Sequence, residues 1–358
     1  MKTLLRLLVK SQHQRNRSGS AQTEKGMTLI ELLIGTVMAF LIITPMLAFV
    51  VDMLNTDRKE QVKANTEQDI QAAVDFIAQD LSQAIYIYDN GADGVPTLLA
   101  GNFLPPVATN GTPILVFWKR QIQKNALPVT PSAQANNPPP SGCVPNATPG
   151  TPTECNDTYV LSLVAYYQVS GGPGIWCQPS GNSCPSRITR YQIRAGIKDP
   201  RAADPVNQPY YAATAVKSGQ EPSDAYDSSF DISQPTKKVS KVGVNWDSDV
   251  LVNYIDHSSG PAVTGNDECQ TALGTPMDTT GVTPIKIPET TLRIPPAPPD
   301  SVNSFYACVD TSKNIARVTI RGNSLRRLQA NDAEFKTTSS AFFPTASVQV
   351  QGLGARGK

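Results

Sequence analysis

One carboxylate lies inside the most apolar stretch of the sequence. Glu31 is followed by 20 residues without a charged side chain, Leu32 to Val51, and a charge in such a segment is costly to bury in lipid. The dipole at a helix N-terminus stabilises a carboxylate by about 0.3–1 kcal/mol, which is too little to offset that cost. We therefore expect Glu31 to bind a cationic partner; the alternative is that it only reaches the lipid headgroups.

Six cysteines form the second group with a chemistry of its own. All of them follow the apolar stretch, as Cys143, Cys155, Cys177, Cys184, Cys269 and Cys308. Outside the cytoplasm the environment is oxidising and favours disulfides. Many connectivities are open, but the short loops favour Cys143–Cys155 and Cys177–Cys184, which leaves Cys269–Cys308. A metal site is not expected, since no Cys-x-x-Cys occurs and a single histidine follows the first 26 residues.

Two further patterns could bind a ligand, and each has a simpler interpretation. Residues 89–94 resemble half of a calcium loop, but Ala100 stands where the last carboxylate is needed, so we expect a tight turn. Trp118, Trp176 and Trp246 could stack on sugars or pack in the core. No nucleophile elbow, phosphate-binding loop or dinucleotide fingerprint occurs. We expect no enzymatic activity and no cofactor, although two glycosidase carboxylates would leave no motif.

The charge of the chain is balanced overall but unevenly distributed. The 358 residues include 31 basic and 30 acidic residues, and 40% are hydrophobic, which argues against a basic nucleic-acid binder and an acidic disordered chain. The first 26 residues contain six basic residues and one acidic residue. The remainder of the chain is therefore mildly acidic.

The apolar stretch after this basic segment is long enough to cross a membrane, since about 20 apolar helical residues span the hydrocarbon core. Basic residues before the stretch favour a cytoplasmic N-terminus and place the rest outside. A secretory signal peptide would need a shorter apolar core and a small-residue cleavage site, which Ala48–Asp52 does not offer. A plain anchor does not explain Glu31. Pro45 lies inside the stretch and allows a helix kink.

Residues 24–33, Glu-Lys-Gly-Met-Thr-Leu-Ile-Glu-Leu-Leu, resemble the class III signal of type IV pilins and type II secretion pseudopilins. The resemblance implies that a membrane peptidase cuts between Gly26 and Met27 on the cytoplasmic side and methylates Met27. A glycine before the cut has no side chain to obstruct a narrow cleft. The resemblance also supplies the cation for Glu31, which is the free N-terminal amine of a neighbouring subunit.

The remaining sequence predicts an α+β fold of the pilin type. Apolar residues from Val62 to Tyr88 recur at helical spacing, so one helix is expected over 28–88, half membrane-spanning and half amphipathic, with Asp69, Asp75 and Asp80 on its polar face. An antiparallel sheet should cover the apolar stripe. Strands are expected at Pro113–Trp118, Thr158–Ser170, Arg187–Ile193, Lys241–Tyr254 and, as a hairpin, Val302–Val309 with Ile315–Ile320.

These patterns divide the chain into five parts. They are a cleaved leader (1–26), a membrane and assembly helix (27–51), an amphipathic helix half (52–90), a β-rich head (91–330) and a flexible tail with little apolar pattern (331–358). Proline-rich and polar composition predicts irregular insertions on the head at 125–155, 200–238 and 261–300, clamped by the disulfides.

The long leader, the large six-cysteine head and the helix at residues 75–84 look like a pseudopilin of cyanobacterial hormogonium polysaccharide secretion. This resemblance implies a minor structural subunit of a short filament that supports polysaccharide secretion and gliding motility. It would be a single-pass protein of the inner membrane with an extracytoplasmic head. Its partners would be the prepilin peptidase, other pseudopilins, the inner-membrane assembly platform, membrane lipid and polysaccharide, with no nucleic acid.

Three alternatives remain open. The chain could be a minor pilin for twitching, adhesion or DNA uptake. It could be the J-type pseudopilin of protein secretion, which the helix at residues 75–84 also resembles. From a different class, the head could bind or cleave glycans at the surface of a pilus.

Overall fold

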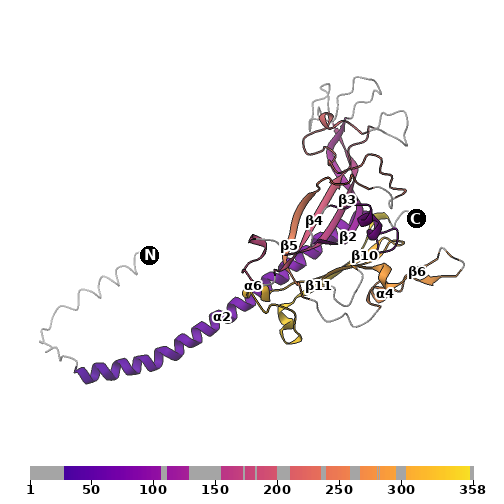
Figure 1. The fold of residues 1–358 in the computed structure, drawn as a ribbon. Helices are drawn as coiled ribbons and strands as arrows, with labels where there is room; N and C mark the ends of the chain where they lie inside the picture. The colour runs from indigo at the N-terminus through magenta and orange to yellow at the C-terminus, as the bar shows by residue number, and fades with distance from the viewer. Residues whose placement is uncertain are drawn as a thin grey trace, which may run out of the picture. The chain divides into compact units, whose positions relative to one another are not determined.

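The computed structural model describes residues 28–105, 111–128, 155–171, 174–181, 184–199, 210–234, 239–258, 267–279, 281, 283–295 and 304–354. The chain divides into two units, Met1–Arg58 and Lys59–Lys358. Figure 1 shows the order of the elements, in which a long N-terminal helix is followed by antiparallel strands. The fold is α+β, as expected.

The long helix α2 (Leu29–Ser82) changes character between the two units. In the first unit its large apolar side chains, from Leu29 to Leu54, are exposed. In the second unit a stripe is buried that consists of Thr66, Ile70, Ala73, Val74, Ile77, Asp80 and Leu81. The spacing of three and four residues along this stripe matches the helical period. One helix therefore contains an uncovered apolar segment and an amphipathic segment.

The helix ends earlier than the periodicity predicts. It stops at Ser82 rather than near Tyr88, and Ala84–Ile87 form strand β1. This segment contains Ile85, Tyr86 and Ile87, whose β-branched and aromatic side chains suit a strand. Pairing with the next strand satisfies its backbone, with Ile87 opposite Phe117. The predicted amphipathic half over 52–90 is therefore a helix followed by a strand and a turn.

The first sheet contains five antiparallel strands in the order β1-β2-β3-β4-β5. The strands are β2 (Gly111–Pro128), β3 (Cys155–Ser170), β4 (Ser186–Arg194) and β5 (Asp247–Ile255), in addition to β1. Each of β2 to β5 contains or overlaps a predicted strand. Strand β2 runs ten residues beyond its predicted end at Trp118 and so includes 125–128, which were expected to be irregular. Its pairing with β3 continues through an irregularity between Gln123 and Leu127.

The second sheet has the order β11-β10-β9-β8. It consists of β8 (Arg293–Ile294), β9 (Phe305–Asp310), β10 (Ile315–Arg321) and β11 (Thr345–Gln351). Strands β9 and β10 form the predicted hairpin. The expectation of a flexible tail over 331–358 is wrong for β11, which pairs with β10 along its whole length. The strand packs on the core through the alternating side chains of Ala346, Val348 and Val350.

Short elements fill the connections between the strands. They are α3 (Val95–Ala100), η2 (Gly174–Trp176), η3 (Ala213–Ala215), α4 (Glu268–Ala272), β6 (Met277–Asp278), β7 (Ile285–Lys286), α5 (Glu289–Leu292), α6 (Leu325–Leu328) and η4 (Thr337–Phe342). The region 261–300 was expected to be irregular, but its described part contains α4, α5 and three short strands. A small separate apolar cluster forms around Cys269 and Cys308. Side-chain packing at this disulfide orders a segment that has no regular hydrophobic period.

One apolar core joins α2 to both large sheets. It contains Ile70 and Ile77 from the helix, Phe117 from β2 and Val318 from β10. The helix approaches the end of β10 closely at Gly322, where a Cβ atom would lie 2.9 Å from Ile70 Cγ1 and 2.9 Å from Thr66 Cγ2. Glycine at this position lets the helix and the sheet pack without a side chain between them.

We predict that Gly322→Ala lowers the stability of the head. The added methyl group would collide with two helix side chains that have little room to move, and overpacking of this kind costs about 1–3 kcal/mol. Gly281→Ala is the matched control, since a Cβ atom there would meet only the Thr283 carbonyl oxygen at 3.7 Å. Thermal unfolding of both variants measures the difference, and equal melting temperatures would contradict the prediction.

Candidate functional site

The N-terminus of α2 is capped by the residue before it. The backbone N–H of Glu31 donates to the carbonyl of Thr28 at 3.0 Å and lies 3.3 Å from its hydroxyl Oγ1. Thr-x-x-Glu at a helix start is the sequence pattern of a capping box, and this role of Thr28 was not predicted although the pattern is visible in the sequence. Glu31 lies in the first turn, exposed. Gly26 and Met27 lie outside the described residues.

The segment that follows Glu31 has the properties of a membrane span. Helix α2 is long and apolar enough to cross a membrane by length and composition. The large side chains from Leu32 to Val51 are exposed, and no other described residue covers them. This supports the predicted single span. The compartment on either side stays a prediction.

Helix α2 continues through Pro45. Proline has no N–H to donate to the preceding turn, and Thr44 beside it uses its hydroxyl to donate to the Phe40 carbonyl at 2.8 Å. Thr36 makes a similar bond to the Leu33 carbonyl. The kink expected at Pro45 stays a prediction.

A second group of charged residues lies where the helix meets the five-stranded sheet. Asp80 of α2 is buried, with a side chain only 9% exposed. Its Oδ1 is 2.6 Å from Lys119 Nζ on β2, and its Oδ2 is 2.7 Å from Arg190 Nε on β4. The hydroxyl of Tyr166 on β3 donates to Oδ2 at 2.7 Å. Three neighbouring strands therefore bind one carboxylate of the helix, and we name these four residues the Asp80 cluster.

The charges of the Asp80 cluster fix its protonation. Burial by itself would raise the pKa of Asp80, but Arg190 and Lys119 lower it below its usual value. Burial and the nearby Asp80 charge raise the pKa of Tyr166 well above its usual value, so its hydroxyl stays a donor. Near neutral pH the cluster holds one carboxylate and two cations. These ion pairs attach the helix to the sheet.

The sequence placed Asp80 on the polar face of the helix, and this is wrong. Asp80 lies three residues after Ile77 and next to Leu81, so it is part of the buried stripe. A partial signal was present, since Arg190 lies on a predicted strand and Lys119 directly follows the predicted end of another at Trp118. Which of the many charges would meet could not be known without the order of the strands.

Two of the three expected disulfides are confirmed. Cys177–Cys184 has an S–S distance of 2.09 Å and Cys269–Cys308 one of 2.02 Å. Cys143 lies outside the described residues, so its expected pairing with Cys155 stays a prediction.

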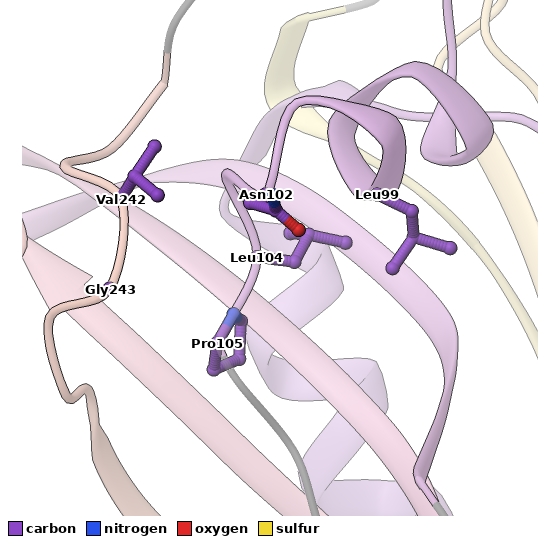
Figure 2. A pocket seen from close by; sticks show the side chains of 6 residues that line it. All are labelled: Leu99, Asn102, Leu104, Pro105, Val242 and Gly243. Atoms are coloured by element: carbon purple, nitrogen blue, oxygen red, sulfur yellow. The ribbon is translucent and has the colours of Figure 1, made fainter. Parts of the chain in front are cut away.

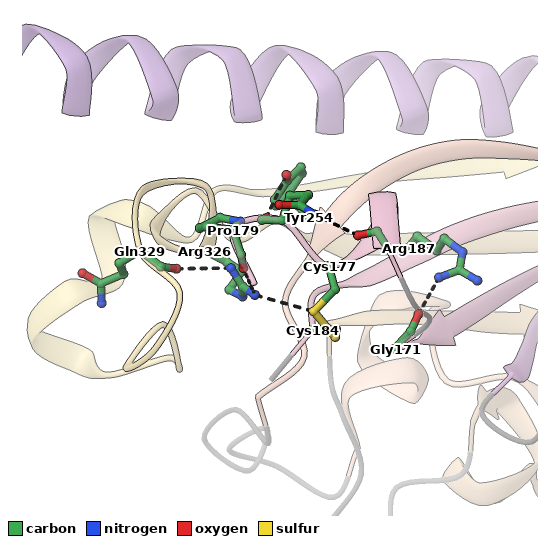
Figure 3. Close-up of a disulfide and its surroundings, with 10 residues drawn as sticks. Gly171, Cys177, Pro179, Cys184, Arg187, Tyr254, Arg326 and Gln329 are labelled. Atoms are coloured by element: carbon green, nitrogen blue, oxygen red, sulfur yellow. Dashed lines mark hydrogen bonds between the residues drawn. A yellow bond between two sulfur atoms is a disulfide. The ribbon is translucent and has the colours of Figure 1, made fainter. Parts of the chain in front are cut away.

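The Cys177–Cys184 loop is bound to a second part of the head (Figure 3). The buried guanidinium of Arg326 donates to the Pro179 carbonyl at 2.6 Å, and the Tyr254 hydroxyl donates to the Gln178 carbonyl at 3.0 Å. The disulfide therefore presents backbone carbonyls to an arginine and a tyrosine from distant segments. These two hydrogen bonds hold the backbone of Gln178 and Pro179 in place.

The tryptophans divide between packing and partial exposure. Trp118 is fully buried and stacks on Phe230, with the two ring centroids 4.0 Å apart. Its indole N–H donates to the Tyr88 hydroxyl, with Nε1 3.0 Å from the oxygen. Trp246 is also buried. Both therefore pack in the head and offer no surface to a sugar. Trp176 is half-buried, and Arg187 lies 5.1 Å from its ring centroid.

The calcium-like residues 89–94 form the expected tight turn. Asp89 Oδ1 accepts the backbone N–H of Gly91 at 2.8 Å, which is a typical Asx-turn bond. Burial raises the pKa of Asp89, and the hydrogen bond from Gly91 opposes that rise. Within the described ranges, no group of three or more histidines, cysteines and acidic residues is placed to hold a metal ion.

A shallow cavity of about 220 Å³ lies beside α3. Figure 2 shows its lining, which consists of Leu99, Asn102, Leu104, Pro105, Val242 and Gly243. None of these side chains is an acid, a base or a nucleophile at ordinary pH. The cavity can accept an apolar group and supplies no chemistry.

No protein-family model, curated protein or solved structure matches this chain. The structure itself shows a long apolar N-terminal helix followed by antiparallel sheets. This arrangement fits a pilin-like architecture.

We predict that Asp80→Asn destabilises the head in a pH-dependent way. Loss of the charge leaves Lys119 and Arg190 buried without a carboxylate, and breaking a buried pair costs about 3–5 kcal/mol. Because the pKa of Asp80 is lowered in the folded state, its contribution is complete above its unfolded pKa of about 3.9 and is lost as the pH falls through the folded value. Urea unfolding should show a large difference at pH 7 that shrinks below about pH 4.

Asp75→Asn is the matched control for this experiment. Asp75 is an exposed residue of the same helix, and its Oδ1 accepts a hydrogen bond from Gln71 at 3.1 Å. Its loss should cost well under 1 kcal/mol. An Asp80→Asn penalty that stayed constant from pH 7 to pH 2 would contradict the assigned protonation.

Proposed function

We propose that this protein is a minor pseudopilin, a structural subunit of a type IV pilus-like or type II secretion-like filament. One observation carries the proposal. In a single continuous helix, the N-terminal segment exposes its large apolar side chains while the C-terminal segment is part of the core of the head. Such a helix can serve first as a membrane anchor and then, beside identical or related helices, as the assembly element of a filament.

The start of α2 supports the proposed assembly step. The helix begins at Leu29, after the capping residue Thr28. Cleavage after Gly26 would leave a mature N-terminus at Met27, two residues before the helix. Its amine would be a compact cation close to the helix end of its own subunit. Glu31 of a neighbouring subunit would neutralise that amine and fix the register between the two helices.

The proposed topology follows from the charges along the chain. The basic residues before the apolar stretch favour retention in the cytoplasm, so the head would lie on the other side of the inner membrane. Two disulfides in the head suit an oxidising compartment. The resemblance to hormogonium polysaccharide secretion leads us to assign the filament to polysaccharide export and gliding motility.

A minor pilin for twitching, adhesion or DNA uptake and a J-type pseudopilin of protein secretion share the same architecture. Neighbouring genes separate these systems. Glycosyltransferases nearby would favour polysaccharide export, whereas a secretin and twitching motors would favour the other systems.

We predict that mass spectrometry of the mature protein finds an N-methylated Met27. Cleavage on the cytoplasmic side of the membrane would remove residues 1–26 and leave the apolar helix attached. Gly26→Val should block cleavage, because a branched side chain would fill the cleft that an extended glycine leaves free. An intact Met1, or a new N-terminus after Ala48, would falsify the processing assignment.

We also predict that Glu31→Gln prevents incorporation into the filament. The neutral amide leaves a neighbouring N-terminal amine unpaired among apolar helices, and an unpaired buried charge costs about 3–5 kcal/mol. The assembled fraction should fall at least about tenfold, since about 1.4 kcal/mol is a factor of ten. The measurement is the amount of protein in sheared filaments relative to the membrane fraction.

Glu67→Gln is the control, because Glu67 is an exposed residue of the same helix outside the apolar segment. It should assemble normally. If Glu31→Gln assembled as well as Glu67→Gln, then Glu31 would only reach the lipid headgroups.

A further inference from the structure

Strands β2 and β3 extend beyond the rest of their sheet as a two-stranded ribbon (Figure 1). Strand β4 pairs with β3 only from Ser162 onward, whereas β2 pairs with β3 down to Cys155. One face of the ribbon is covered by the chain itself. Gln121 Oε1 accepts from Ser162 Oγ at 2.6 Å and from Gln192 Nε2 at 2.7 Å. Gln123 of the same face is buried.

The opposite face of the ribbon is open and carries an unusual pair of side chains. Ile122 and Tyr159 lie directly opposite each other in the ladder, so they share one face. Ile122 is 51% exposed and Tyr159 is 63% exposed. Arg120 lies two residues before Ile122, and the exposed Lys124 lies two residues after it. We name Arg120, Ile122, Lys124 and Tyr159 the ribbon strip.

The two cations of the ribbon strip have no carboxylate partner among the described residues. Arg120 lies against the Tyr159 ring, with its guanidinium carbon 5.7 Å from the ring centroid. The exposed carboxylate of Asp157, two residues before Tyr159, forms no ion pair with either cation, and its Oδ1 accepts the backbone N–H of Asn125 at 2.8 Å. The backbone at Lys124 is held in place, because its carbonyl accepts from Gln220 Nε2 at 2.8 Å. The strip is therefore an ordered cationic surface with an apolar centre.

We propose that the ribbon strip binds an anionic polysaccharide. Arg120 and Lys124 would pair with carboxylate or sulfate groups along the polymer, and about four residues of extended strand separate them by roughly 13 Å. Tyr159 and Ile122 would pack against the C–H faces of the sugar ring between those groups. The choice of a glycan as ligand rests on the proposed role in polysaccharide export.

The chemistry of the ribbon strip suits a polymer of charged sugars, and an acidic peptide is the alternative that the test below distinguishes. A linear polysaccharide makes contact through flat ring faces and repeated charges. A shallow strand surface with one aromatic ring and two flanking cations is sufficient for that contact.

The test uses the full-length protein in detergent micelles or nanodiscs. Binding of three probes, alginate, dextran and polyglutamate, is measured on a biosensor. Alginate, an anionic polysaccharide, should bind, and its binding should weaken as the salt concentration rises. Dextran, a neutral polysaccharide, should bind much more weakly. The double variant Arg120→Gln/Lys124→Gln should weaken alginate binding at least about fivefold. Tyr159→Ala should weaken it while leaving its salt dependence unchanged.

Lys241→Gln/Lys336→Gln is the matched control, because it removes the same net charge at two exposed positions outside the strip. Thermal unfolding confirms that each variant is folded. Equal weakening by this control would overturn the strip as a site and indicate binding by net charge alone. Binding of polyglutamate in place of alginate would overturn the glycan assignment in favour of an acidic protein partner. A lack of binding to all three probes would overturn the proposal.

The outcome is separable from that of the proposed function. Absence of an N-methylated Met27, together with alginate binding that depends on the strip, would leave the strip valid and remove the pseudopilin assignment. The converse result, a methylated Met27 without alginate binding, would leave the pseudopilin and remove the strip.

Discussion

The attachment of the helix to the head depends on one buried carboxylate. Asp80 binds Lys119, Tyr166 and Arg190, which come from three adjacent strands. The apolar stripe of α2 could slide along a sheet with little loss of burial, because hydrophobic contact is not directional. A carboxylate that must meet two cations and a hydroxyl at hydrogen-bond distance permits one register.

The apolar side chains of the two segments of α2 differ in what covers them. The segment in the head is covered by the sheets, and Gly322 allows the close approach. The large apolar side chains of the segment before it are exposed, with no described residue covering them, and their burial requires lipid or other helices. Glu31 is the charged residue in the first turn of that segment. Its pairing with a neighbour's N-terminal amine would fix the register between subunits, as the contacts of Asp80 fix the register between helix and sheet within the head.

Much of the fold was predictable from local patterns. The apolar stretch after a basic segment indicated the exposed helix, and alternation over Thr158–Ser170 indicated β3. The cysteine spacing indicated Cys177–Cys184. The failures have physical causes. The segment 84–87 fits a helical period as well as a strand, and pairing with β2 decided between them. Apart from its two valines, strand β11 has only small and polar residues, and it is ordered by pairing with β10.

The sequence alone determined the features that depend on neighbouring residues, which are the span, its charge asymmetry, the position of Glu31 and the short disulfide loop. Tertiary structure decided the features that depend on which distant residues meet. From the sequence, Asp80 is one of several acidic residues on a polar helix face. In the structure, three strands surround it with two cations and a hydroxyl. From the sequence, Tyr159 is an ordinary aromatic residue of a strand. In the structure, it lies exposed on one face of the ribbon beside Ile122. The order of strands in a sheet cannot be predicted from local sequence, because backbone hydrogen bonding is the same for every pair of strands. Packing between distant side chains selects which strands become neighbours.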